Sequence, residues 1–398
     1  MQDLPTLKLK KDEDRRLRSG HLWIFSNEID VAATPLKGFT KGDLARIESH
    51  KNEFIGIGYV NPESLITARV LSRSPSCKPN VDFFRHRLKQ ALELRQLFYD
   101  KPFYRLVYGE SDGLPGLIVD RFGDVFAVQA NTAGMECLQD PLLDAITSVF
   151  QPKAIILRNS SGLRVLEGIE SYDKVVYGHL AGEVEIIENG SKFHVDVLGG
   201  QKTGWFFDHR ENRRLLGGLC RGKEVLDLFS YSGAWSIPCA QNGAKVTSVD
   251  ASQSAIDLLG SSAALNNVES AVDPICSDVF DFLKDAREKR KKFDVVIVDP
   301  PAFIKRKKDL RKGLEGYRRL NQMALQVLNK NGLLVSASCS YHLREDDLLD
   351  ILRSSARHTD RDLVVTAKRG AGPDHPIHPA IPETSYLKAI FCQVRSTL

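Results

Sequence analysis

The order of apolar and polar residues divides the chain into stretches with different patterns. From residue 1 to about 75, short runs such as EFIGIGYV and LITARVLS are rich in Ile, Val and Tyr and are separated by turn residues, which is typical of a small β-rich domain. Over residues 76–182, the run VDFFRHRLKQALELRQLF has apolar positions at helical spacing. GLPGLIVDRFGDVFAVQAN indicates two strands joined at a turn. We therefore expect a central α+β domain there.

A third pattern fills residues 183–398. It opens with EVEIIENGSKFHVDV, which predicts a β-hairpin over 183–198 because Asn189-Gly190 is a strong turn signal. Short apolar runs (EVLDLF, KVTSVD, FDVVIVDPP and GLLVSASC) then alternate with helical stretches, which indicates a mainly parallel sheet covered on both faces. The predicted fold class is α/β: a doubly wound, Rossmann-like domain preceded by the β-rich and α+β domains. In such a sheet, ligands bind at the carboxyl ends of the strands.

Composition narrows the possible functions. With 42% hydrophobic and 27% charged residues, the chain is typical of a soluble globular protein. No run approaches the roughly 20 apolar residues needed to cross a bilayer, so we expect a cytoplasmic protein without a membrane partner. The seven cysteines form no C-x-x-C pair, which favours neither disulfides nor a zinc ribbon. His375 and His378 have ligand-like spacing but no accompanying cluster, so no metal is expected.

Acidic residues follow the predicted strands of the third stretch. Asp227 and Asp250 stand at the ends of the first two strands, and Asp278 and Asp299 follow the next two. The first turn holds a single glycine, Gly233, where a dinucleotide site needs G-x-G-x-x-G. Turn amides and carboxylates better suit an amino-acid ammonium, a ribose diol held by Asp250, and an adenine amino group near Asp278. An aspartate at one strand end is commonly a helix N-cap, but four on consecutive strands favour a site.

In DLFSYSG and VDPPAF together, the chain resembles the class I S-adenosylmethionine-dependent methyltransferases. The resemblance implies S-adenosylmethionine as cofactor, with Asp227, Asp250 and Asp278 contacting its methionine, ribose and adenine parts and Asp299 on the substrate side. It adds Phe229 and Ser230, in the turn after the first strand, to the cofactor-binding set. Lys202, Asp208 and Arg210, in QKTGWFFDHR, are implied to close over the cofactor. Without the resemblance, that stretch is equally a loop with a salt bridge.

Further motifs narrow the resemblance. GGQKTGWFFDHRENRRLL, DPPAF and SCS occur in this order behind a leader, SGHLWIFSNEI, and a central DGLPGLIVDRFGD, and GPDHPIHPAIPETSYLKAIF follows. The chain is similar to the ribosomal RNA large-subunit cytosine-C5 methyltransferases that carry a PUA domain. This implies that the product is 5-methylcytosine, in 23S or other large-subunit ribosomal RNA, and that the partner is RNA. A homodimer is compatible with the resemblance.

Cytosine-C5 chemistry gives Cys339, in SASCSYHL, a role. A lone strand cysteine is more often packing than chemistry. However, cytosine C5 is a poor nucleophile until a thiolate adds at C6, and Cys339 falls on the strand expected beside Asp299. Asp299 is expected to form hydrogen bonds with N3 and the exocyclic amine of the base. Better-known RNA cytosine-C5 methyltransferases have a second cysteine where Ala302 stands, so the group that removes the C5 proton is not identified.

Substrate contacts and rival functions complete the predictions. Candidate RNA contacts are Pro300, Phe303, Lys305 and Arg306, at the start of a basic stretch that suits a phosphate backbone. A solvated loop explains the charges equally well. The alternatives are a guanine-modifying methyltransferase, whose relatives replace SCS with an asparagine-rich stretch, and a non-catalytic RNA-binding assembly factor. An NAD oxidoreductase is disfavoured by the missing glycines.

Overall fold

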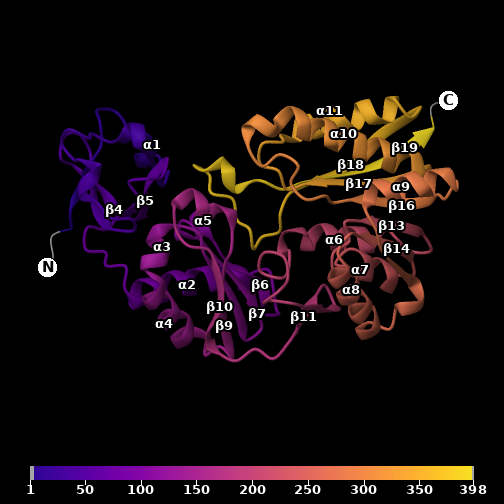
Figure 1. Ribbon diagram of the computed structural model, residues 1–398, viewed down its shortest axis with the longest axis horizontal. Helices are drawn as coiled ribbons and strands as arrows, with labels where there is room; N and C mark the ends of the chain where they lie inside the picture. The colour runs from indigo at the N-terminus through magenta and orange to yellow at the C-terminus, as the bar shows by residue number, and fades with distance from the viewer. Residues whose placement is uncertain (1–3, 397–398) are drawn as a thin grey trace. The chain divides into compact units, whose positions relative to one another are not determined.

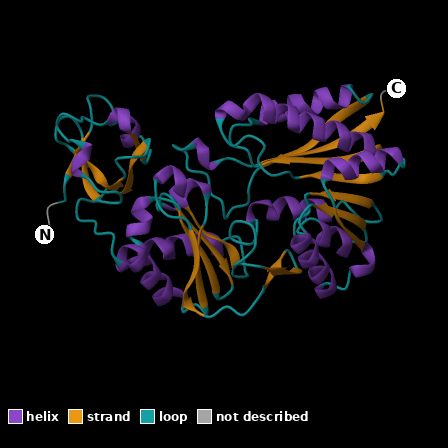
Figure 2. Cartoon of the chain, viewed as in Figure 1, coloured by secondary structure: helices purple, strands orange, loops and turns teal. Residues whose placement is uncertain are grey.

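The computed structural model describes residues 4–396, and the chain forms two compact units. The first comprises the chain through Val184 together with Asp196–Phe207 and Pro373–Thr384. The second comprises Glu185–Val195, Asp208–Gly372 and the chain from Ser385 onward. Figure 2 shows the sheets of both units as orange arrows. The predicted domain boundaries near residues 75 and 182 stay predictions.

A five-stranded sheet in the order β1-β3-β4-β5-β2 occupies the N-terminal part of the first unit. Apolar side chains on alternate positions, such as Ala45 and Ile47 of β3, pack with Ile24 and Val70 in its core, as a sheet with one buried face requires. The short helix α1 spans Arg15–Arg18. The strands are β1 (Thr6–Lys8), β2 (Trp23–Phe25), β3 (Leu44–Glu48), β4 (Phe54–Val60) and β5 (Ile66–Ser72).

The second sheet of this unit has the order β10-β9-β8-β7-β6. Helix α2 begins after Asn80, whose side chain accepts a hydrogen bond from the Phe83 amide, and it buries Phe84 and Leu88 as its spacing predicts. Its strands are β6 (Phe103–Tyr108), β7 (Leu117–Phe122), β8 (Val125–Ala130), β9 (Ala154–Asn159) and β10 (Tyr172–Gly178). Its helices are α2 (Val81–Gln96), α3 (Ala133–Cys137), α4 (Gln139–Phe150) and α5 (Gly162–Glu167).

A two-stranded hairpin, β11 (Val184–Glu188) and β12 (Ser191–Val195), precedes the large sheet. Its turn residues Asn189 and Gly190 have φ of 52° and 87°. These positive values are what a two-residue turn of matching twist requires, and Asn-Gly supplies them at low cost.

The second unit is built on a seven-stranded sheet in the order β15-β14-β13-β16-β17-β19-β18. Strands β13 to β17 run parallel to one another, and β19 lies between β17 and β18 and is antiparallel to both. The predicted doubly wound sheet is confirmed. The strands are β13 (Glu224–Leu228), β14 (Lys245–Asp250), β15 (Val272–Cys276), β16 (Phe293–Val298), β17 (Leu328–Ser338), β18 (Arg361–Arg369) and β19 (Lys388–Ser396).

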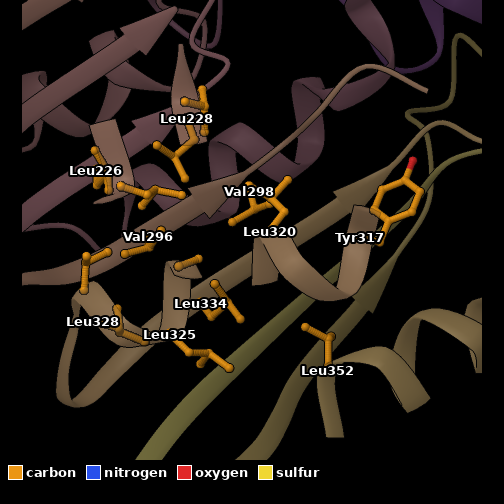
Figure 3. Packing of buried hydrophobic residues seen from close by; sticks show 14 of the residues in the cluster. Leu226, Leu228, Val296, Val298, Tyr317, Leu320, Leu325, Leu328, Leu334 and Leu352 are labelled. Atoms are coloured by element: carbon orange, nitrogen blue, oxygen red, sulfur yellow. The ribbon is translucent and has the colours of Figure 1, made fainter. Parts of the chain in front are cut away.

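Helices cover both faces of this sheet, with α6, α7 and α8 on one side and α9, α10 and α11 on the other (Figure 1). Figure 3 shows leucine and valine side chains of β13, β16 and β17 packed against Leu320 and Leu325 of α10. This burial on both faces explains why the strand sequences are nearly continuous apolar runs. The helices are α6 (Arg210–Gly217), α7 (Ser236–Gln241), α8 (Gln253–Leu265), α9 (Val279–Glu288), α10 (Leu310–Val327) and α11 (Glu345–Arg357).

Candidate active site

The turn after β13 has an unusual backbone. Phe229, Tyr231 and Gly233 all have positive φ, at 60°, 47° and 84°, and such strain in non-glycine residues is concentrated at functional positions. A Cβ on Gly233 would lie 2.9 Å from the Leu259 side chain, so this position requires glycine for both its backbone and its packing. The Ser230 amide donates to the Val249 carbonyl (3.0 Å), which ties the turn to β14.

Asp227, on β13, is fully buried. Its Oδ2 accepts a hydrogen bond from the Ser236 hydroxyl at 2.6 Å, and within residues 4–396 its Oδ1 has no hydrogen-bond partner. Burial raises the pKa of Asp227 to about 7, and the nearby carboxylates of Asp299 and Asp250 add to this rise. An unsatisfied buried acceptor costs about 1–3 kcal/mol, so the carboxyl is suited to a ligand that brings a donor or a positive charge.

Asp250 ends β14 and is fixed by two backbone amides. Its Oδ2 accepts from the Tyr231 amide and its Oδ1 from the Ser252 amide, both at 2.9 Å. A carboxylate has about four acceptor sites, so two remain for hydroxyl donors. The hydroxyls of Ser230 and Ser232 are buried and have no hydrogen-bond partner in the described part of the chain. The turn after β13 and the carboxylates of Asp227 and Asp250 therefore offer the hydrogen-bonding groups that a small polar ligand needs.

Asp299 follows β16 and is held from two sides. The Trp235 indole donates to its Oδ2 at 3.0 Å, and His209 Nε2 lies 3.3 Å from its Oδ1. Burial opposes ionisation of this carboxyl, but the charge of His209 and the Trp235 hydrogen bond outweigh it, so the pKa of Asp299 is lowered. Burial likewise opposes the charged imidazole, while Asp299 raises the pKa of His209. The two groups favour each other's charged forms.

His209 and Trp235 were not among the residues singled out from the sequence. Their rings lie 5.1 Å apart and frame the Asp299 carboxylate. His209 stands within the WFFDHR stretch and Trp235 directly before α7. His209 could have been found from the sequence, because it lies between the predicted residues Asp208 and Arg210. No local sequence pattern distinguishes Trp235 as a site residue.

Other predicted cofactor residues have partners of their own. Asp208 is buried and accepts from the Tyr386 hydroxyl at 2.5 Å. Arg210 Nε lies 3.6 Å from Glu188 of the hairpin, the salt bridge that the sequence alone also allowed. Lys202 belongs to the first unit, where its ammonium lies 4.7 Å from the centre of the Phe206 ring.

Asp278 is the N-cap of α9. Its Oδ1 accepts from the amides of Phe280 (2.8 Å) and Asp281 (3.2 Å). This is the ordinary capping role of an aspartate after a strand. The electrostatic partners of Asp227 include Asp250 and Asp299. Asp250 and Asp299 thus lie within electrostatic range of Asp227, while Asp278 caps α9, and its contact with adenine stays a prediction.

Cys339 follows β17 directly and is half-buried. Its neighbours Ser338 and Ser340 share the Tyr317 hydroxyl of α10, at 2.8 and 2.9 Å. The Ser340 hydroxyl also accepts from the Ile304 amide at 3.3 Å. Since β16 and β17 are adjacent, Cys339 and Asp299 leave the same edge on neighbouring strands. The two serines thus fix the strand end that carries the thiol.

The predicted RNA contacts lie on the segment after β16. Pro300 is buried, and the Phe303 ring packs against Tyr317 with centroids 4.8 Å apart. Lys305 and Arg306 are exposed, and Arg306 makes only a loose 3.6 Å pair with Asp309. Such exposed pairs contribute little stability, so both cations are accessible.

Among the described residues, no group of three or more His, Cys, Asp or Glu side chains could hold a metal ion. In the same part of the chain, no helix is long and apolar enough to cross a membrane.

Comparison with known proteins decides the family. A model of the PUA-like domain matches residues 7–73, and a model of the S-adenosylmethionine-dependent methyltransferases matches residues 170–390, more than half of the chain. The chain belongs to the S-adenosylmethionine-dependent methyltransferases. This confirms the predicted PUA-like domain and the predicted cofactor, while the roles of single site residues stay predictions.

Individual relatives agree with this family. A protein of Escherichia coli O139:H28 named ribosomal RNA large subunit methyltransferase I is 34% identical over 98% of this chain and 99% of its own length. The protein of the same name from Klebsiella pneumoniae strain 342 is also 34% identical, over 98% of both chains. A solved methyltransferase complexed with SAH matches 98% of this chain and all of its own, with a TM-score of 0.83 at 22% identity, which shows the fold.

Tyr317→Phe should destabilise the protein, because both serine hydroxyls beside Cys339 lose a buried partner. We expect the free energy of unfolding to fall by about 1–3 kcal/mol, measured by urea denaturation. Tyr341→Phe, on an exposed side chain, is the matched control and should change little. Equal stability of Tyr317→Phe and wild type would show that the serines do not depend on this hydroxyl.

Asp227→Asn should weaken S-adenosylmethionine binding about tenfold or more, because the predicted charge-assisted contact to the ligand ammonium would be lost. Since the pKa of Asp227 is raised to about 7, wild-type affinity should increase from pH 6 to pH 8, and binding below pH 7 should release a proton. Calorimetry measures both effects.

The raised pKa of Asp227 should also make the stability of the cofactor-free protein depend on pH. The folded protein keeps the Asp227 proton up to about pH 7, whereas the unfolded chain loses it near pH 4. The free energy of unfolding should therefore fall as pH rises across this interval. Asp227→Asn should flatten both pH profiles, and Asp285→Asn, on the exposed side of α9, should not. An Asp227→Asn protein with wild-type affinity would rule out the ammonium contact.

Proposed function

We propose that this protein methylates C5 of a cytosine in large-subunit ribosomal RNA. The relatives named for that RNA, at 34% identity over nearly the whole chain, support the substrate class. The observation that carries the cytosine assignment is the placement of Cys339, a half-buried thiol directly after β17, the strand that pairs with β16, which Asp299 directly follows. Methyl transfer to a more nucleophilic atom would leave this thiol without chemical use.

The proposed reaction uses Cys339 as a nucleophile. Its thiolate adds to C6 of the base, the C5=C6 bond opens, and C5 becomes nucleophilic enough to take a methyl group. Bound S-adenosylmethionine would supply that methyl group as an electrophile and leave as S-adenosylhomocysteine. A base then takes the C5 proton, and the electrons of the C5–H bond re-form the C5=C6 bond as the C6–S bond breaks, which returns the thiolate and leaves 5-methylcytosine. Two moderate steps replace one prohibitive step.

Asp299 orients the base in this proposal. Because His209 lowers its pKa, its carboxylate is ionised and can accept from the exocyclic amine of cytosine. Negative charge grows at N3 as the thiolate adds, and a carboxylate alone cannot neutralise it. Asp299 raises the pKa of His209 and so favours its protonated form, with Nε2 lying 3.3 Å from Asp299 Oδ1. Moving that proton to the carboxyl would allow a hydrogen bond to N3.

RNA binding is assigned to two parts of the chain. The PUA-like domain over residues 7–73 and the exposed Lys305 and Arg306 are the proposed contacts, and the cations would add a salt-dependent share of affinity. We place the activity in the cytoplasm, where ribosomal RNA is modified, and the homodimer stays a prediction. Of the rival functions, a guanine methyltransferase needs no covalent adduct, and an assembly factor needs no intact cofactor site.

Cys339→Ala should abolish methyl transfer, with a loss of about a thousandfold or more because the nucleophile is removed. The measurement is mass mapping of methylated nucleosides in large-subunit RNA incubated with labelled cofactor. Cys276→Ala, on an exposed thiol at the end of β15, should retain activity. Undiminished formation of 5-methylcytosine by Cys339→Ala would rule out Cys339 as the nucleophile. Label found in guanine would rule out cytosine as the methylated base.

A further inference from the structure

Lys388 begins β19 and is buried, which is unusual for a lysine. Its ammonium donates a hydrogen bond to the Ser340 carbonyl at 2.7 Å. In the sheet register Lys388 lies opposite Ser338, so it faces the strand end that carries Cys339. The residue stands in SYLKAIF, a run that resembles an ordinary buried strand.

The surroundings of this ammonium are not those of a simple ion pair. Burial lowers the pKa of Lys388 to about 8, and Cys339, Asp347 and Glu345 act in the opposite direction. Both carboxylates belong to α11 and have cations of their own: Asp347 pairs with Arg344 at 3.2 Å, and Glu345 pairs with Lys368. On the α10 side, Tyr317 is raised in pKa mainly by burial, with Cys339 contributing.

We propose that Lys388 is a positioning residue that holds Cys339 in its thiolate form. At neutral pH Lys388 is largely an ammonium, because its pKa of about 8 lies above pH 7. The Cys339 thiol gives its proton to water, which leaves a thiolate beside a positive charge that is already present. An opposite charge within reach lowers a thiol's pKa by about 1–3 units. This inference rests on the proposed role of Cys339 as nucleophile and deepens it, since a half-buried thiol needs a cation to ionise at neutral pH.

A purely structural role is the competing explanation, because the hydrogen bond from Lys388 to the Ser340 carbonyl could serve only to hold the end of β17 against β19. Two substitutions separate charge from hydrogen bonding. Lys388→Gln keeps an N–H donor for the carbonyl but removes the charge, whereas Lys388→Arg keeps both donor and charge. If Lys388 has only a structural role, both variants should change the pH midpoint of Cys339 ionisation alike. If its charge stabilises the thiolate, Lys388→Gln should raise that midpoint and Lys388→Arg should leave it low.

The test is the pH profile of alkylation by iodoacetamide, which forms a thioether and releases iodide, in the full-length protein without RNA. Mass spectrometry of peptides reports each cysteine, so Cys276 and Cys137, both exposed, serve as references in the same molecule. We expect the wild-type midpoint for Cys339 to lie below that of Cys276. In Lys388→Gln it should rise by about one unit or more, making alkylation at pH 7 about tenfold slower. Lys388→Arg should retain the low midpoint.

Several outcomes would overturn the inference. A wild-type midpoint for Cys339 at or above that of Cys276 does so without any variant. Equal midpoints in Lys388→Gln and wild type, or equal shifts in both variants, do so as well. Failure of the proposed function has a different result: if Cys339→Ala still forms 5-methylcytosine while the alkylation shift is present, the charge coupling stands and the nucleophilic role falls.

Discussion

The parallel pairing of β13, β14, β16 and β17 is the constraint on which the site depends. Because the carboxyl ends of these strands meet at one edge, residues far apart in sequence converge there: Asp227, Asp250, Asp299 and Cys339. Burial, together with the repulsion from the nearby Asp299 and Asp250 carboxylates, disfavours the charged form of Asp227 and raises its pKa to about 7. A cationic ligand relieves this cost. The fold therefore prepares the proposed cofactor site by bringing these carboxylates together.

The residues around this edge divide between supports and reacting groups. Trp235 and His209 fix the Asp299 carboxylate, and Tyr317 fixes the serines on either side of Cys339. These supports come from the segments and helices that cover the sheet, so the helical layers determine how the strand ends present their side chains. A loosely held carboxylate or thiol would lose the geometry on which the proposed nucleophilic addition depends.

The sheet could be predicted from the sequence because its strands are buried on both faces and are therefore almost continuously apolar. Strand β18 was missed, since RDLVVTAKR lies at an edge and is largely exposed. The strand-end aspartates were found, but their local pattern could not show that Asp227 is buried without a partner for Oδ1 in the described residues, whereas Asp278 caps α9. Trp235 and Lys388 were missed because each acts through a partner distant in sequence. Local patterns predict the elements, and long-range contacts assign the roles.

Covalent trapping tests the central claim most directly. In RNA carrying 5-fluorocytosine at the target position, the fluorine cannot leave as a proton does, so the enzyme–RNA adduct should persist after methyl transfer. The account predicts a stable complex that forms only with S-adenosylmethionine present, with the RNA attached to Cys339 when the peptides are mapped by mass spectrometry. Methylation of the matching unmodified RNA without any trapped complex, or attachment at another residue, would contradict it.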